Sequence, residues 1–156
     1  MVIGYENNGA DPEMVAIAQG FFAKYMKGAH VELRLFTSGP ASLAALASGS
    51  LQFMTGIGNP PAAAAISQGV PLQVVWAQEL YTTDEGLVVR DGSGIHSLKD
   101  LQHRQLALVV GSTSPFEVAT ALKSLGLAES SVTFVNMSPP VMVATWERGQ
   151  LNAAYV

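Results

Sequence analysis

The stretch QLALVVGSTSPFEVATALKSLG, residues 105–126, places a short apolar run directly before a helical pattern. The run QLALVV has no alternation of polar and apolar positions, which is typical of a strand covered on both faces. Pro115 favours the first turn of a helix, where an amide is not needed, and Gly126 accepts the left-handed conformation that ends a helix. The stretch therefore predicts a buried strand over 105–110 and a helix over 115–125.

The same order of strand and helix repeats along the rest of the chain. Four more helical patterns begin at a proline and are followed by a glycine: 12–27, with Asp11 as N-cap, 40–48, 60–68 and 139–148. The apolar runs around them predict strands over 1–5, 31–36, 51–57, 72–78, 86–90, 132–137 and 151–156. Such alternation favours an α/β fold with mostly parallel sheet and flanking helices.

Residues 79–97 interrupt this alternation with a polar, glycine-containing stretch that has no helical pattern. A stretch of this kind is typical of a connection between compact units. We therefore expect a first lobe over 1–85, a crossover over 86–97 and a second lobe over 98–156.

Composition excludes several classes of protein. Hydrophobic residues make up 49% of the 156 residues and charged residues 13%, unlike a disordered chain. The net charge of −4 argues against a nucleic-acid partner, and no apolar run reaches the roughly 18 residues of a membrane span. The absence of cysteine excludes disulfides and thiolate metal sites. No signal-peptide pattern precedes VIGYE, so we expect a cytosolic protein or a mature or truncated form of an exported one.

Motifs for catalysis and for cofactors are missing from the sequence. No connection matches GxGxxG, GxxxxGKS/T or GxSxG, so neither a nucleotide cofactor nor a serine nucleophile elbow is indicated. His30, His96 and His103 stand apart from any candidate nucleophile or second metal ligand. We expect no catalytic residue, no metal and no cofactor.

Four β-to-α connections are rich in small and hydroxyl residues: TSGP (37–40), GIGNPP (56–61), GSTSP (111–115) and MSPP (137–140). In a parallel α/β sheet these connections lie at the carboxyl ends of the strands, where ligands bind. Helix N-termini offer amide donors and a partial positive charge, so they favour anions. The same residue types also start ordinary helices, and the sequence leaves both interpretations open.

Acidic and amide residues gather at two further places, near the crossover and after the first predicted strand: Glu79, Asp84, Glu85, Glu6 and Asn7. A carboxylate in a cleft between lobes could receive the ammonium group of a substrate. The alternative for each position is a solvated loop.

Three stretches, taken in order, resemble the substrate-binding proteins of taurine, alkanesulfonate and nitrate ABC importers. They are FTSGPASLAALASGSLQFMTGIGNPPAAAAISQGVPL (36–72), EGLVVRDGSGIHSLKDLQHRQLALVVGSTSP (85–115) and VNMSPPVMVATWERGQLNAAYV (135–156), and the last is most similar to the taurine-binding branch. The resemblance implies a type II periplasmic-binding fold, with the second lobe incomplete here, that captures a small sulfonate such as taurine for an ABC permease in the membrane. It implies a binding protein rather than an enzyme, monomeric when full length, and periplasmic or lipid-anchored outside the cytoplasm.

The resemblance also implies which residues face the ligand. The anion-facing positions carried over from the family are Ser38, Gly39, Asn59, Pro60, Ser112, Thr113 and Ser114. Together with Glu6, Asn7 and Glu79, they form the expected ligand site. Asn59 stands where similar proteins often have serine, and Glu6 where close relatives tend to carry glutamine. A carboxylate at position 6 would repel a sulfonate or pair with an amine.

Two other functions stay open at this point. The thiamin-pyrimidine synthases are enzymes that share this architecture, but they need a histidine-bearing site. The effector-sensing domain of a transcription regulator would normally follow a helix-turn-helix segment, which the sequence lacks. Members of the resembled family run to about twice this length, so we expect exposed apolar surface and weak or absent ligand binding in this chain.

Overall fold

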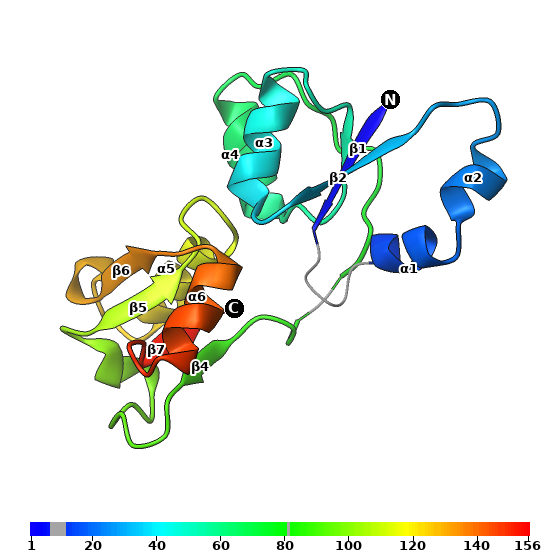
Figure 1. Ribbon diagram of the computed structural model, residues 1–156. Coiled ribbons are helices and arrows are strands. Elements are labelled where there is room, and N and C mark those ends of the chain that lie inside the picture. Colours follow the sequence, from blue (N-terminus) through cyan, green and yellow to red (C-terminus); the bar gives the residue numbers. More distant parts are fainter. Residues whose placement is uncertain (7–11, 81) are drawn as a thin grey trace. The chain divides into compact units, whose positions relative to one another are not determined.

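The chain is divided into two compact units, Met1–Leu80 and Tyr81–Val156. The computed structural model describes residues 1–6, 12–80 and 82–156, so the predicted Asp11 N-cap lies outside the described residues. Each unit combines parallel strands with helices (Figure 1), which confirms the predicted α/β class. The lobe boundaries at residues 85 and 97 stay a prediction.

The sheet of the first unit has the strand order β2-β1-β3. Its strands are β1 (Val2–Glu6), β2 (Glu32–Phe36) and β3 (Phe53–Met54). Both pairings are parallel, with Glu6 opposite Phe36 and Gly4 opposite Met54. The carboxyl ends of all three strands therefore lie at one edge. Helices α3 (Gly39–Ala47) and α4 (Asn59–Ser67) follow β2 and β3 and lie side by side (Figure 1).

The single helix predicted over 12–27 is wrong, because the structure has two short helices there. They are α1 (Pro12–Ala18) and α2 (Phe21–Tyr25). Gly20 separates them with φ 66° and ψ 28°, a left-handed conformation that interrupts an α-helix and that glycine adopts without steric cost.

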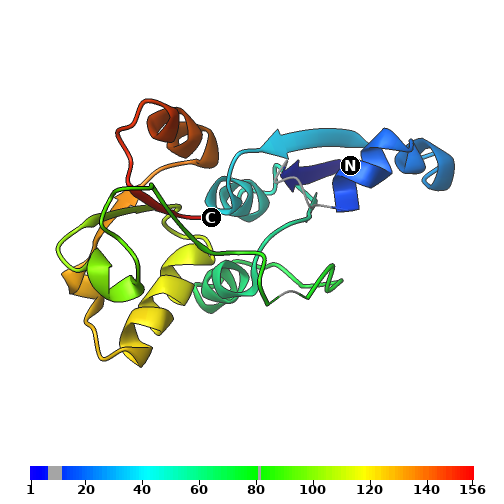
Figure 2. The same ribbon diagram turned by 90° about the horizontal axis from the view of Figure 1, so that it is seen from below.

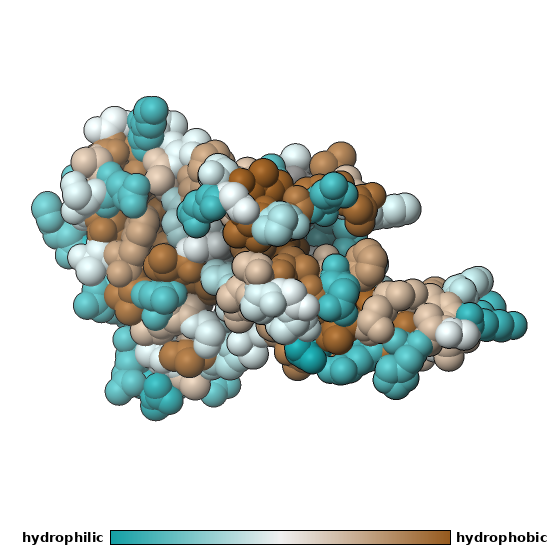
Figure 3. Space-filling model, turned by 90° about the horizontal axis from the view of Figure 1, so that it is seen from above, coloured by the Kyte–Doolittle hydropathy of each residue, from teal (hydrophilic) through white to brown (hydrophobic). Residues whose placement is uncertain are grey.

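The strand predicted over 72–78 is also absent, and β3 covers only two residues of the predicted 51–57. Apolar composition alone does not make a strand, because strand formation depends on packing and pairing with neighbouring segments. The side chains of Val74, Val75 and Trp76 are exposed by 69%, 74% and 77%. The expected exposed apolar surface is therefore present in this unit, and Figure 3 shows hydrophobic residues reaching the surface in patches.

The sheet of the second unit has the strand order β4-β7-β5-β6. Its strands are β4 (Leu87–Val89), β5 (Gln105–Leu108), β6 (Thr133–Asn136) and β7 (Ala153–Tyr155). β5 pairs in parallel with β6 and β7, and β4 pairs antiparallel with β7. Helices α5 (Ser114–Ser124) and α6 (Pro139–Glu147) lie on opposite faces of this sheet (Figures 1 and 2).

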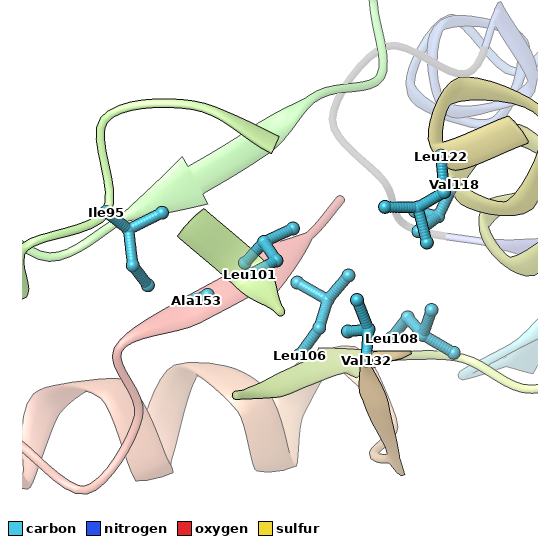
Figure 4. Packing of buried hydrophobic residues seen from close by; sticks show 8 residues of the cluster. All are labelled: Ile95, Leu101, Leu106, Leu108, Val118, Leu122, Val132 and Ala153. Carbon is cyan, nitrogen blue, oxygen red and sulfur yellow. The ribbon is translucent and has the colours of Figure 1, made fainter. Parts of the chain in front are cut away.

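Strand β5 divides the core of the second unit by the alternation of its side chains. Leu106 and Leu108 pack with Val118 and Leu122 of α5 (Figure 4), in a cluster completed by Ile95, Leu101, Val132 and Ala153. Ala107 belongs to a second cluster with Met142 of α6, Leu151 and Ala154. The predicted cover on both faces holds for Leu106, Ala107 and Leu108. The predicted bounds of 105–110 are too long, because the strand ends at Leu108 and Val110 is 50% exposed. Each buried leucine contributes about 1.5–3 kcal/mol.

Two short 3-10 helices, η1 (Leu98–Leu101) and η2 (Glu129–Ser131), complete the second unit. Asp100 caps η1, since its Oδ2 accepts hydrogen bonds from the His96 amide at 3.0 Å, the Ser97 amide at 2.8 Å and the Ser97 hydroxyl at 2.9 Å. These donors favour the charged carboxylate and lower the pKa of Asp100. Within the described ranges, none of the helices is long and apolar enough to cross a membrane.

Candidate functional site

The carboxyl edge of the first sheet is where most of the predicted site residues of the first unit come together. Glu6 is the last residue of β1, Ser38 is the N-cap of α3 just after β2, and Asn59 begins α4 after β3. Because the three strands are parallel, these positions share one edge. Sequence reasoning placed them there from the connections alone.

The Glu6 carboxylate lies directly beside the start of α3. A methyl group added at Gly39 would stand 3.8 Å from Glu6 Oε1, which is ordinary van der Waals contact. This oxygen is shielded from solvent. The carboxylate therefore takes a position near the positive end of the helix dipole, which an incoming anion would also favour.

The first turn of α3 keeps few free donors. The amides of Ala41 and Ser42 both donate to the Ser38 carbonyl, at 3.1 and 3.3 Å, and Pro40 has no amide hydrogen. The Gly39 amide and the Ser38 hydroxyl remain, since Ser38 makes no side-chain capping bond. An anion at this helix start would therefore be held by two groups rather than by a full turn of amides.

The first turn of α4 is depleted in the same way. Pro60 and Pro61 carry no amide hydrogen, and the Ala62 amide donates to the Gly58 carbonyl at 3.2 Å. The donors left are the backbone amide and the exposed side-chain amide of Asn59. Pro60 thus contributes shape to the site and no hydrogen bond.

In the second unit, the loop before α5 uses two of its three predicted donors to hold its own shape. The Ser112 hydroxyl donates to the Val109 carbonyl at 2.8 Å and accepts the Ser114 amide at 3.2 Å. The buried Ser114 hydroxyl lies 3.2 Å from that of Ser112. Thr113 makes no side-chain capping bond, so its hydroxyl is the donor best placed for a ligand. The roles of Ser112 and Ser114 toward a ligand stay a prediction.

Three residues that sequence reasoning missed lie at the same edge. The Tyr155 hydroxyl, at the end of β7, donates to Glu117 Oε2 in the first turn of α5 at 2.6 Å. Asn136, at the end of β6, accepts the Val110 amide through Oδ1 at 3.0 Å and so braces the loops after β5 and β6. The position of Glu117 one turn into a proline-started helix was a signal for the first pair, but its partner is 38 residues away.

One predicted residue, Glu79, is not brought to these loops. Glu79 is exposed in a segment without helix or strand, and within the described ranges no hydrogen bond or ion pair joins it to Ser38 or Asn59. Asn7 lies outside the described residues. Their roles stay predictions.

Chemically, both edges offer neutral donors next to a carboxylate. In the first unit Glu6 accompanies Ser38 and Asn59, and in the second Glu117 accompanies Thr113. Such a set suits an anion that also carries a cationic group. Among the described residues there is no group of three or more His, Asp or Glu side chains that could hold a metal ion.

Known proteins resemble this chain along its whole length. The taurine-binding periplasmic protein of Escherichia coli strain K12 is 36% identical over all 156 residues, which correspond to 47% of that protein. The chain spans about half the length of the curated relatives it matches.

Solved structures agree in fold. The alkanesulfonate-binding protein SsuA from Xanthomonas axonopodis pv. citri, bound to MOPS, matches with a TM-score of 0.85 and 23% identity, covering 100% of this chain and 53% of that one. The periplasmic aliphatic sulphonate binding protein SsuA from Escherichia coli matches with a TM-score of 0.73 and 23% identity over the same shares. These matches establish the type II periplasmic-binding fold.

A family model gives the membership itself. The model described as "NMT1/THI5 like" matches residues 7–156, nearly the entire chain. Its span includes both sheets' carboxyl edges and every connection considered above except the end of β1. The chain therefore belongs to the NMT1/THI5-like family.

Proposed function

We propose that the protein is the solute-binding component of an ABC importer, which captures a small aliphatic sulfonate and delivers it to a membrane permease. The observation that carries this proposal is the set of uncommitted donors at helix starts along the carboxyl edges: Ser38, the Gly39 amide, Asn59 and Thr113. The 36% identity to a taurine-binding protein supports a sulfonate, with taurine as the first candidate.

Recognition of this kind needs no basic side chain. A sulfonate spreads one negative charge over three oxygens, and each hydrogen bond to a charged group contributes about 1.5–3 kcal/mol. Three or four such bonds, less the cost of association, correspond to micromolar affinity, about −8 kcal/mol. Dipolar donors hold the anion and also release it, which a transport cycle requires.

The ammonium group of taurine would pair with a carboxylate of the protein. We assign this role to Glu79, with Glu6 at the start of α3 as a second carboxylate that disfavours ligands without a cation. Asn7 would add a further polar contact, and Ser112 and Ser114 would face the same anion as Thr113.

The proposed role is binding without catalysis. The competing interpretation, a pyrimidine-synthase-like enzyme, would need a histidine-bearing site, and His30, His96 and His103 stand apart from the donors named above. The proposal also places the protein in the periplasm or on a lipid anchor outside the cytoplasm, as a monomer that meets the permease.

Isothermal titration calorimetry tests the proposal, using the protein in the form in which its host expresses it. The ligands are taurine, ethanesulfonate, nitrate and a pyrimidine phosphate. Saturable heat with taurine is expected. Heat with the pyrimidine phosphate alone would favour the enzyme. The absence of binding heat with both taurine and ethanesulfonate would rule out the proposed sulfonate-transport function.

The Glu79→Gln variant tests the amine contact separately. It should weaken taurine about tenfold while leaving ethanesulfonate unchanged, because only taurine has an ammonium group. Asp84→Asn is the matched control, since it removes the same charge five residues away. Equal losses for both ligands would remove Glu79 from the site.

A further inference from the structure

The second unit has a pocket at the edge opposite the predicted ligand loops. It has a volume of about 240 Å³ and is lined by Ile95, Arg104, Gln105, Gln150, Leu151 and Asn152. Gln105 is the first residue of β5, and Asn152 directly precedes β7. Because β5 and β7 are parallel, both strands begin at this edge and end at the other one. This pocket, called the Arg104 pocket below, is therefore distinct from the loop at Ser112–Ser114.

The lining combines an apolar floor with polar walls. Ile95 and Leu151 are buried, while the Arg104, Gln105, Gln150 and Asn152 side chains are exposed. Arg104 is the one charged residue of the lining, so the pocket carries positive charge. In the described part of the chain Arg104 forms no ion pair. A guanidinium in a pocket, with no carboxylate of its own, is suited to an external one.

The structure holds Arg104 in place from several sides. Nη1 of its guanidinium donates to the Ser93 carbonyl at 3.0 Å, and Nη2 would lie 3.7 Å from a methyl group added at Gly94. Its backbone amide donates to the Leu101 carbonyl, and its carbonyl accepts the Thr133 amide, both at 2.9 Å. The backbone of Arg104 is therefore fixed, and the bond to Ser93 orients its guanidinium, which lowers the entropic cost of binding.

The residue before Arg104 adds a second observation. His103 has φ 62°, the only positive φ of a non-glycine residue in the ranges that the structure describes. Its amide donates to the Ser131 carbonyl at 2.6 Å. Left-handed backbone at a non-glycine residue costs free energy and persists where the surroundings enforce it, often next to a functional group. Here it turns the chain immediately before Arg104.

We propose that the Arg104 pocket binds the carboxylate of a small organic acid. The planar guanidinium matches the two oxygens of a carboxylate, and the amides of Gln105 and Asn152 supply neutral donors beside it. The apolar floor of Ile95 and Leu151 accepts a short hydrocarbon chain. Gln150 is oriented by Arg148, whose Nε donates to its Oε1 at 3.0 Å. The small volume limits the ligand to a few carbon atoms.

Proton–nitrogen correlation spectra of the 156-residue chain, recorded during a titration with sodium propionate, test this proposal. Sodium chloride replaces propionate in the reference series, so that ionic strength stays constant. The amide signals of Ile95, Gln105 and Asn152 should shift and saturate. Arg104→Gln should weaken binding about tenfold or more, and Arg104→Lys by less, because lysine keeps the charge but loses the planar fork.

Two further variants provide a control and an alternative for this experiment. Lys123→Gln removes the same charge from exposed α5 and should leave propionate binding unchanged. If Arg104→Gln fails to fold, Asn152→Asp serves instead, since a carboxylate inside the pocket should compete with propionate. The proposal would be overturned if Arg104→Gln and Asn152→Asp both bound propionate as the wild type does. It would also be overturned if Lys123→Gln lost as much propionate affinity as Arg104→Gln, or if the shifts were confined to residues 112–117.

Discussion

The guanidinium carbon of Arg90 lies 4.7 Å from the centroid of the Trp146 ring. The same side chain donates through Nε to the Leu151 carbonyl at 3.1 Å and through Nη2 to the Trp146 carbonyl. One arginine thus joins the end of β4 to the last turn of α6 and to the segment before β7. It secures the antiparallel edge of a sheet that is otherwise parallel.

Replacing Arg90 should destabilise the second unit. Arg90→Met removes the cation–π contact and both hydrogen bonds, so the free energy of unfolding should fall by about 2 kcal/mol. Arg90→Lys should lose about half of that, because lysine keeps the charge only. Urea denaturation followed by tryptophan fluorescence measures both. Lys123→Met is the control, and a midpoint equal to that of Arg90→Met would contradict the expectation.

Gly4 of β1 should not tolerate a side chain. A methyl group there would stand 2.7 Å from Met54 Sδ and 2.9 Å from both Leu51 Cδ2 and Phe36 Cε2. Gly4→Ala should therefore cost about 1–3 kcal/mol through overpacking. Gly86→Ala is the matched control, since nothing lies within 4 Å of its added methyl group. Thermal unfolding of the two variants decides, and equal melting temperatures would disprove the close packing of Gly4.

The hydrogen bond from Tyr155 to Glu117 should appear as an energetic coupling. In a double-mutant cycle of Tyr155→Phe and Glu117→Gln, the two effects on the free energy of unfolding should differ from additivity by about 1 kcal/mol. Chemical denaturation of the four proteins measures this coupling. The pair Tyr155→Phe and Glu129→Gln should be additive, and additivity in both cycles would mean that the 2.6 Å contact contributes nothing.

The cap of η1 should make stability depend on pH in the acid range. The pKa of Asp100 is lowered by the hydrogen bonds from the His96 amide and from Ser97, so its contribution is complete above the pKa of the unfolded chain. It is lost as pH falls through the lower, folded-state pKa. Asp100→Asn should therefore be less stable than wild type at neutral pH, and the gap should close in acid. Urea midpoints measured from pH 7 to pH 2 test this, and a constant gap would contradict it.

The position of Glu6 leads to a prediction about ligand selectivity. Glu6→Gln should strengthen the binding of ethanesulfonate about tenfold and of taurine less, because the carboxylate beside Gly39 repels an anion without a cationic group. Glu32→Gln removes the same charge from the far end of β2, where Glu32 pairs with Arg34 at 2.7 Å. Calorimetry should show no change in the ethanesulfonate affinity of Glu32→Gln. Unaltered ethanesulfonate affinity in Glu6→Gln would separate this carboxylate from the site.

Much of the fold could be predicted because its signals are local. Proline starts and glycine ends located α3, α4, α5 and α6, and the glycines after them, at 49, 69, 126 and 149, have φ between 72° and 86°. The apolar run over 105–110 correctly indicated a strand, and its residues 106–108 are covered on both faces. The failures have non-local or cooperative causes. Residues 72–78 have strand composition but form no strand in the described part of the chain, and Gly20 breaks a helix whose apolar pattern continues across it.

The candidate site divides in the same way. The connections that carry Ser38, Asn59 and Thr113 could be read from residue types, because helix starts have a known composition. The sequence could not show which of these donors are used within the protein. The Ser112 hydroxyl, for example, donates a hydrogen bond to the Val109 carbonyl. Nor could the sequence reveal that Glu6 lies against Gly39.

The sequence by itself determined most of the alternation of strands and helices and the ends of α3, α4, α5 and α6, because these depend on conformational preferences within a few residues. It also indicated the family, through the order of three long stretches. Only the tertiary structure decided which polar groups meet: Tyr155 with Glu117, Arg90 with Trp146, and Arg104 in its pocket. These contacts join residues far apart in the chain, and their partners are chosen by strand order and packing.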